Sequence, residues 1–264
     1  MVKKHIAKAY LWILLLLLYA PVVIIVIFSF TEAKVLGSWT GFSTKLYSSL
    51  FTPSSYHSLT KALLNTLSIA LISAIVATLL GSMAAVGIYN MRHRQKRIIT
   101  LINNIPILNV DLITGVSLFF LFLFLGVSQG YTTVVLAHIT LCTPFVVLCV
   151  LPKLRQMNPN IYEAALDLGA TPWEALRKVI FPEIRSGMIT GFILAVMISI
   201  NDFIVTIFTI GNEGLETLST YIYIDARKGG LPPELRPLTT IMLLVILVLL
   251  LAFNKRIKKK SVDR

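Results

Sequence analysis

The sequence predicts an all-α integral membrane protein with six transmembrane helices. Three observations support this: the apolar content, its division into long runs, and the position of the basic residues. The chain has 264 residues, of which 56% are hydrophobic, and its mean hydropathy is +0.82. A water-soluble domain rarely reaches such values because most of its surface must face water. The formal charge of +12 is distributed in short clusters between apolar runs, which argues against a nucleic-acid partner.

Six apolar segments are long enough to cross a lipid bilayer. A helix needs about 20 residues to span about 30 Å of hydrocarbon and satisfies its backbone hydrogen bonds internally. The segments cover residues 10–30, 63–89, 98–127, 131–151, 186–210 and 238–253. We expect residues 1–264 to form a single transmembrane domain. The third segment is the least regular of the six.

The basic residues are concentrated on one predicted side of the membrane. The N-terminus, the second and fourth loops and the C-terminus together hold 18 of the 24 Lys and Arg residues. They are Lys3, Lys4, Lys8, Arg92, Arg94, Lys96, Arg97, Lys153, Arg155, Arg177, Lys178, Arg185, Lys255, Arg256, Lys258, Lys259, Lys260 and Arg264. Cytoplasmic loops are enriched in such residues, so both termini are expected in the cytoplasm.

Two of the loops expected outside the membrane are long enough to fold. They cover residues 31–61 and 211–237. The second combines an amphipathic stretch, residues 215–226, with Gly and Pro residues that interrupt helices. A partner-binding surface and a solvated loop both fit this pattern.

The cytoplasmic loop at residues 158–182 is too long for a simple turn. Asn160 is suited to cap a first short helix, with Glu163 at the third position of a capping box. Gly169 is suited to end that helix in a left-handed conformation. A plain structural role as a helix cap is therefore one interpretation of Glu163. A second short helix is expected to begin at Thr171 and Pro172, with Glu174 as its capping carboxylate.

The same loop contains a longer pattern. Glu163 is followed by Ala164 and Ala165, then by Gly169 six positions after the glutamate and by Pro182 nineteen positions after it. This spacing, in a cytoplasmic loop before a late membrane helix, resembles the EAA loop of ABC-transporter importer permeases. Two conservative departures, Val179 and Phe181, weaken the match only slightly. The resemblance extends over nearly the whole chain and is strongest to spermidine/putrescine permeases; the segments that carry it begin at Pro21, Trp39 and His138 and surround Asp202.

The resemblance implies a type I ABC importer permease with six transmembrane helices. Its loop would be a coupling helix that docks into a cleft on an ATP-hydrolysing subunit. The implied partners are a second homologous permease subunit, a dimer of ATPase subunits, an extracytoplasmic substrate-binding protein and the lipid bilayer of a bacterial plasma membrane. The implied cargo is a polyamine, although another organic cation or a metal complex is also compatible.

Two carboxylates lie within predicted membrane helices, where a charge costs roughly 2.5 to 3.5 kcal/mol on insertion scales. Asp111 follows the helix breaker Pro106, and Asp202 follows Asn201 in the fifth helix. For a cationic cargo, Asp111, Asn201 and Asp202 could line the path. Pairing with a base or binding a helix end is the alternative role. His138, inside the fourth helix, is expected to make structural hydrogen bonds, with a proton relay as the alternative.

Motifs for catalysis are missing from the sequence. No Gly is followed by Lys, so the phosphate-binding loop of ATPases is absent, and ATP and Mg are expected on a separate subunit. We find no esterase nucleophile elbow, no zinc-protease motif and no spaced set of metal ligands. The chain is therefore predicted not to be an enzyme and to bind no cofactor. An ion-coupled carrier is a weaker alternative, since such a carrier does not need a docking helix.

Overall fold

The computed structural model describes residues 2–33, 37–50, 57–212, 214–227, 233–244 and 247, and all regular structure in these ranges is helical. The chain forms two compact units, one of residues 58–223 and one of residues 1–57 with 224–264. The helices are α1 (Val2–Phe28), α2 (Lys45–Ser49), α3 (His57–Asn90), α4 (His93–Leu108), α5 (Asp111–Phe124), α6 (Tyr131–Gln156), α7 (Ile161–Asp167), α8 (Pro172–Ala175), η1 (Leu176–Ile180), α9 (Phe181–Asn201), α10 (Ile204–Thr209) and α11 (Leu218–Arg227).

Helices of membrane-spanning length cover the first, second and fourth predicted segments. With the continuous helix from Pro172 to Asn201, four described helices are long and apolar enough to cross a bilayer. The count is five if the bent pair of α4 and α5 forms one span. Half of the sixth predicted segment, residues 238–253, lies outside the described residues. Its first residues belong to a described apolar helix, Leu235–Leu244. The organisation of residues 1–264 as one domain stays a prediction.

The third predicted segment is not one helix, contrary to the expectation for residues 98–127. It is split into α4 and α5, whose axes differ by 104°. The break lies at Asn109, where the backbone is extended. Pro106 in the last turn of α4 lacks an N–H group, which weakens the end of that helix.

The fifth predicted segment, residues 186–210, is also broken. Helix α9 ends at Asn201, the backbone is extended at Asp202, and the short helix α10 begins at Ile204. The sequence contained a signal for this break, because Asp is a preferred residue before the first turn of a helix. In the predicted continuous helix, by contrast, Asp202 and Thr206 share one helical face.

The end of this segment that follows the 158–182 loop differs as well. Helical structure begins at Pro172 and runs into the membrane through η1, a short π-helix, and α9. Pro182 lies in the first turn of α9. In a regular α-helix its ring would collide with the carbonyl of Lys178, and the wider π turn relieves this conflict.

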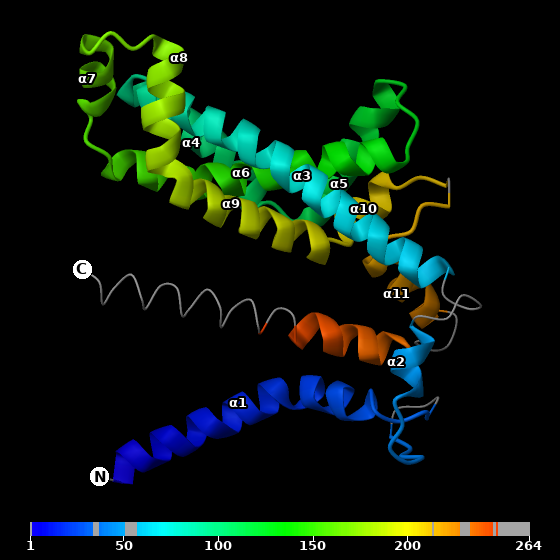
Figure 1. Cartoon of the computed structure of the whole chain (residues 1–264). Coiled ribbons are helices and arrows are strands. Elements are labelled where there is room, and N and C mark those ends of the chain that lie inside the picture. Colours follow the sequence, from blue (N-terminus) through cyan, green and yellow to red (C-terminus); the bar gives the residue numbers. More distant parts are fainter. Residues whose placement is uncertain are drawn as a thin grey trace. The chain divides into compact units, whose positions relative to one another are not determined.

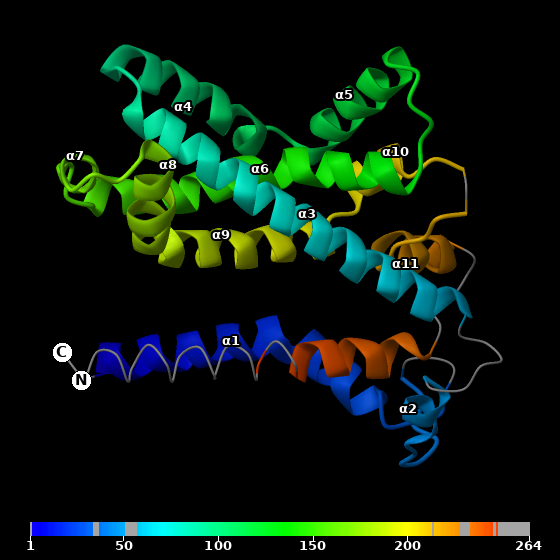
Figure 2. The same cartoon turned by 45° about the horizontal axis from the view of Figure 1, so that its top comes forward.

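The unit of residues 58–223 is built around α6, which packs against α3 and α9 (Figures 1 and 2). Val146 of α6 lies between two glycines. A Cβ atom at Gly81 of α3 would meet Val146 Cβ at 2.8 Å, and one at Gly191 of α9 would meet Val146 Cγ1 at 3.2 Å. Small residues therefore allow three helix backbones to approach closely, as is common inside membranes.

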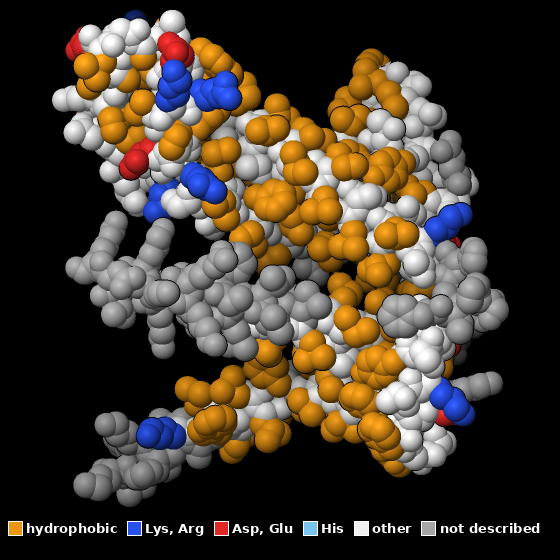
Figure 3. All heavy atoms as spheres, in the orientation of Figure 1, with side chains coloured by type: hydrophobic (Ala, Val, Ile, Leu, Met, Phe, Trp, Pro, Cys, Tyr) orange, Lys and Arg blue, Asp and Glu red, His pale blue; other side chains and the backbone are white. Residues whose placement is uncertain are grey.

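The loop helices α7 and α8 and the helices at the two breaks, α5 and α10, lie toward opposite ends of this unit. Figures 1 and 2 show α7 and α8 beyond one end of α6 and α9, while α5 and α10 lie toward the other end. In Figure 3 hydrophobic side chains cover the middle of this unit, and acidic and basic side chains gather around α7 and α8. This distribution is the one expected for a helix bundle surrounded by lipid, with one polar end in water.

The other unit contains α1, α2 and helix Leu235–Leu244. Residues 10–28 of α1 are apolar and unburied within the chain. Arg236 Nη1 donates to the carbonyl of Ala33 at 2.8 Å, and Glu32 pairs with Lys45 at 3.2 Å. The contact of Arg236 with Ala33 joins the two parts of the chain that make up this unit, and the Glu32–Lys45 pair lies within the first part.

Candidate functional site

The loop with the EAA pattern folds into two short helices, as the sequence predicts. The first, α7, ends at Asp167 and is followed by a turn at Gly169, whose φ of +87° is in the left-handed region. The N–H of Gly169 donates to Leu166 O at 2.9 Å, and that of Ala170 donates to Ala165 O at 3.1 Å. The capping box predicted for Asn160 and Glu163 is wrong, because the Asn160 side chain makes no capping bond.

The second helix, α8, has the predicted cap. Thr171 Oγ1 accepts a hydrogen bond from the N–H of Glu174 at 3.3 Å, and Glu174 Oε2 accepts from the N–H of Thr171 at 3.1 Å. Lys178 Nζ adds a contact to Glu174 Oε1 at 2.8 Å. This ammonium group, together with the two donors of Thr171, lowers the pKa of Glu174 to about 2. Glu174 is thus a charged anchor that fixes where α8 begins.

The lowered pKa of Glu174 predicts the pH dependence of its contribution to stability. A carboxyl with a lowered folded-state pKa stabilises the fold at all pH values above its ordinary pKa of 4.5, and the effect is lost as the pH falls toward about 2. We expect Glu174→Gln to lower the melting temperature of the assembled complex equally at pH 7 and pH 5.5. The control is Glu183→Gln, which replaces another exposed carboxylate. A difference that shrinks markedly between pH 7 and pH 5.5 would contradict this assignment.

The outer face of the loop exposes both polar and apolar side chains. Glu163 and Ala164 are exposed, whereas Ala165 is buried within the loop. Leu168 and Trp173 are 89% and 62% exposed. Sequence reasoning missed these two residues, although large apolar side chains beside a turn in a polar loop are a recognisable sign. Exposed apolar groups rimmed by polar residues are typical of a protein-binding surface.

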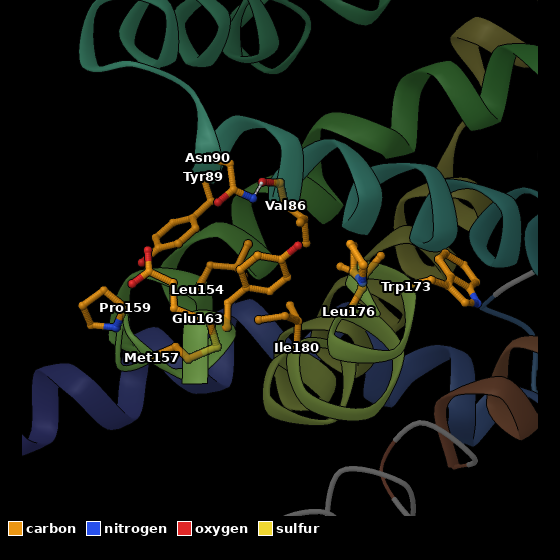
Figure 4. A pocket seen from close by; sticks show the side chains of 12 residues that line it. Val86, Tyr89, Asn90, Leu154, Met157, Pro159, Glu163, Trp173, Leu176 and Ile180 are labelled. Carbon is orange, nitrogen blue, oxygen red and sulfur yellow. Dashed lines mark hydrogen bonds between the residues drawn. The ribbon is translucent and has the colours of Figure 1, made fainter. Parts of the chain in front are cut away.

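A cavity of about 440 Å³ lies behind this surface. It is lined by the end of α3, the end of α6 and the two loop helices. Figure 4 shows Glu163 on the same side of the cavity as Tyr89, with Trp173 on the other side. Leu176 and Ile180 of the π-helix complete the lining. The loop helices therefore stand partly clear of the bundle while joined to it through η1.

The residues predicted to line the substrate path lie at the two helix breaks: Asp111, Asn201 and Asp202. Asp202 is buried at the start of α10, where Oδ1 accepts from the N–H of Val205 at 3.2 Å. Its Oδ2 accepts from the N–H and the hydroxyl of Thr206 at 2.8 and 2.7 Å. Both oxygens are thus occupied at a helix end, which is the alternative role that the sequence left open.

Asp111 and Asn201 are in different surroundings from Asp202. Asp111 is exposed at the first position of α5, and Asn201 is exposed at the last position of α9, where it donates to Met197 O at 2.8 Å. Gly115, one turn after Asp111, packs on the backbone of Val205 in α10. The packing of α5 on α10 brings the two broken segments together.

Comparison with known proteins agrees with this geometry. The family model described as "Binding-protein-dependent transport system inner membrane component" matches residues 77–257. The spermidine/putrescine transport system permease protein PotC of Escherichia coli (strain K12) is 36% identical over 235 residues, which cover 89% of this chain and 87% of the relative. The putrescine transport system permease protein PotI of the same organism is 34% identical, with 86% of this chain and 81% of the relative covered.

The fold has a counterpart among solved structures. A bacterial ABC transporter involved in the import of the acidic polysaccharide alginate matches with a TM-score of 0.73 at 14% identity, and 95% of each chain is covered. This similarity shows the type I ABC importer permease fold. With the family match over residues 77–257, it shows that the chain is a transport subunit and not an enzyme. The chain belongs to the family of binding-protein-dependent transport system inner membrane components, the permease subunits of ABC importers.

Proposed function

We propose that this chain forms half of the translocation pathway of a polyamine importer, for spermidine or putrescine. The observation that supports this most directly is its similarity to PotC and PotI over more than four fifths of each chain. The fold does not identify the cargo, because the alginate transporter with the same fold imports an acidic polysaccharide. A related solute, another organic cation or a metal complex, is the alternative outcome.

The proposed complex contains this chain, a second homologous permease subunit, two ATPase subunits and an extracytoplasmic binding protein. ATP and Mg are bound by the ATPase subunits. The complex lies in the inner membrane of a bacterium, with both termini of this chain in the cytoplasm. The binding protein docks on the outer loops, which contain α2 and α11.

The exposed face of the coupling loop is proposed to bind the ATPase subunit. Glu163 offers a carboxylate to a basic partner, and Ala164 allows a close approach. Leu168 and Trp173 add apolar area on the same loop. Gly169 and Pro182 act indirectly, since the first forms the turn after α7 and the second accompanies the π-helix that leads into α9. Closure of the ATPase dimer then moves α9, and the pathway alternates between outward and inward access.

Asp111 is the carboxylate that we assign to the polyamine path, with Asn201 as a neutral polar group at the other break. Asp202 is proposed to shape the path by holding the start of α10, because its oxygens are already bonded. Separate attractive groups permit the transit of a cation, whereas one tight site would retain it.

The test is uptake of labelled spermidine by cells that lack their own polyamine importers and express the complete transporter. We expect uptake by the intact system, and a reduction of about fivefold or more for Asp111→Asn. This is the effect of losing roughly 1 kcal/mol of attraction between a carboxylate and a cation. Glu183→Gln, which removes an exposed carboxylate at the cytoplasmic end of α9, is the matched control.

Each result has a separate meaning once equal assembly of the complexes has been verified. Absence of spermidine uptake by the intact complex rejects the polyamine cargo and leaves the assignment to the ABC permease family unaffected. Normal uptake by Asp111→Asn removes this residue from the path. Equal losses in Asp111→Asn and Glu183→Gln would indicate a general effect of charge.

A further inference from the structure

A buried polar cluster surrounds the break between α9 and α10. It consists of His138 on α6, Ser199 on α9, Asp202 at the break and Thr206 on α10. These residues are 2%, 3%, 9% and 0% exposed. His138 Nδ1 lies 2.6 Å from Ser199 Oγ, and its Nε2 lies 2.9 Å from Thr206 Oγ1 and 3.4 Å from Asp202 Oδ2. One imidazole ring thus contacts the helices on both sides of the break.

The positions of the protons in this cluster follow from the available donors. Thr206 has one hydroxyl proton, which it donates to Asp202 Oδ2 at 2.7 Å. Thr206 must therefore accept a hydrogen bond from His138, which assigns a proton to Nε2. In the neutral ring Nδ1 then accepts from the hydroxyl of Ser199. Every polar group of the cluster has a partner in this arrangement.

We propose that His138 is a positioning residue that makes α9 and α10 move as one body across the break. Only Asp202 and Phe203 join the two helices along the chain. Such a connection would act as a hinge if nothing else held it. Bending at this point would open the bond to Ser199 or the bond to Thr206, and a buried polar group would lose its partner.

The contacts around the break between α9 and α10 connect the two ends of the permease. Toward the cytoplasm, α9 is continuous with η1 and the coupling loop. On the other side, Ser219 Oγ donates to Asp202 O at 2.9 Å at the beginning of α11, in a predicted outer loop. A movement of the coupling loop is therefore transmitted through α9 to α10. Through the same contacts, a conformational change caused by docking of a binding protein on the outer side is transmitted to the ATPase subunits.

This inference does not depend on the identity of the cargo, and two measurements on the full transporter test it. The first is hydrogen exchange at the α10 amides, which requires no cargo. For His138→Ala we expect at least about tenfold faster exchange, because α10 loses a buried anchor. The second is ATP hydrolysis with and without the spermidine-loaded binding protein. We expect His138→Ala and Ser199→Ala to lose most of the stimulation and to keep the unstimulated rate.

Two further variants distinguish positioning from general stability. His138→Gln keeps one donor and one acceptor, so it should recover part of the stimulation. Thr140→Val removes an exposed hydroxyl of α6 that donates to Leu136 O within the same helix, and this variant should behave as the unmodified protein does.

The proposal is overturned if His138→Ala leaves α10 exchange unchanged, or if exchange rises while stimulation stays normal. It is also overturned if the unstimulated rate falls together with the stimulated rate, as expected for a purely structural role. If the spermidine-loaded binding protein does not stimulate ATP hydrolysis by the unmodified complex, the polyamine cargo is rejected. Hydrogen exchange at the α10 amides then decides by itself whether His138 holds α9 and α10 together.

Discussion

Replacing Gly191 with leucine is expected to prevent assembly of the permease. A Cβ atom at this position would lie 3.2 Å from Val146 Cγ1, 3.3 Å from Val146 Cα and 3.5 Å from Cys149 Cβ. One of these atoms is backbone, so α6 and α9 must separate to accommodate a larger side chain. Overpacking of this kind costs about 1 to 3 kcal/mol and occasionally more. We expect at least a tenfold loss of purified complex, measured by size-exclusion chromatography after solubilisation.

The control for this prediction is Gly87→Leu. Gly87 lies on α3 and is exposed, and a Cβ atom there would meet no described atom within 4 Å apart from its own helix backbone. This variant should yield a normal amount of complex. A normal yield for Gly191→Leu would show that α6 and α9 are not packed as closely as the structure shows.

Replacing Gly169 with valine is expected to uncouple ATP hydrolysis from transport. Its φ of +87° is unfavourable for any residue with a Cβ atom, by about 1 to 2 kcal/mol, and more so for a β-branched one. A Cβ atom built at this position would lie more than 4 Å from every described atom outside Gly169 and its two chain neighbours, so the effect would come from the backbone alone. The turn after α7 would change, and Glu163 and Leu168 would be displaced from the docking surface. We expect severalfold less ATPase subunit in the purified complex and a similar loss of uptake.

Two control variants separate the causes of this effect. Gly126→Val introduces the same kind of strain, at φ +65°, in the turn between α5 and α6, on the opposite side of the membrane from the coupling loop by the predicted topology. Gly87→Val introduces the same side chain without a positive φ. Both should retain the ATPase subunit. If Gly126→Val also loses it, general destabilisation is the cause; if Gly169→Val retains it, the turn does not determine docking.

The sequence by itself determined the membrane class, the order of the apolar segments and the family. These properties depend on composition and on local spacing, which do not change with folding. The second capping box, at Thr171 and Glu174, was predictable because all of its atoms lie within four consecutive residues. The turn at Gly169 was predictable for the same reason.

Only the tertiary structure showed how the third and fifth segments are interrupted. Their hydropathy continues across the breaks, so a window of apolar residues does not detect them. At Asp202 the preference of Asp for the position before a helix conflicts with the long apolar run, which favours one continuous helix. The break is fixed by contacts with residues that are distant in the sequence. His138 is 61 residues before Ser199 and 68 before Thr206.

The surroundings of the two acidic residues also depend on the tertiary structure. Asp111 and Asp202 look alike in sequence, since each lies in an apolar segment beside an asparagine-containing stretch. In the structure one is exposed at the start of α5, and the other is enclosed by α6 and α10. Burial and partners depend on which helices pack together, and packing is a property of distant residues. The sequence therefore identified both carboxylates, whereas the tertiary structure separated an exposed carboxylate from one whose oxygens are bonded at a helix start.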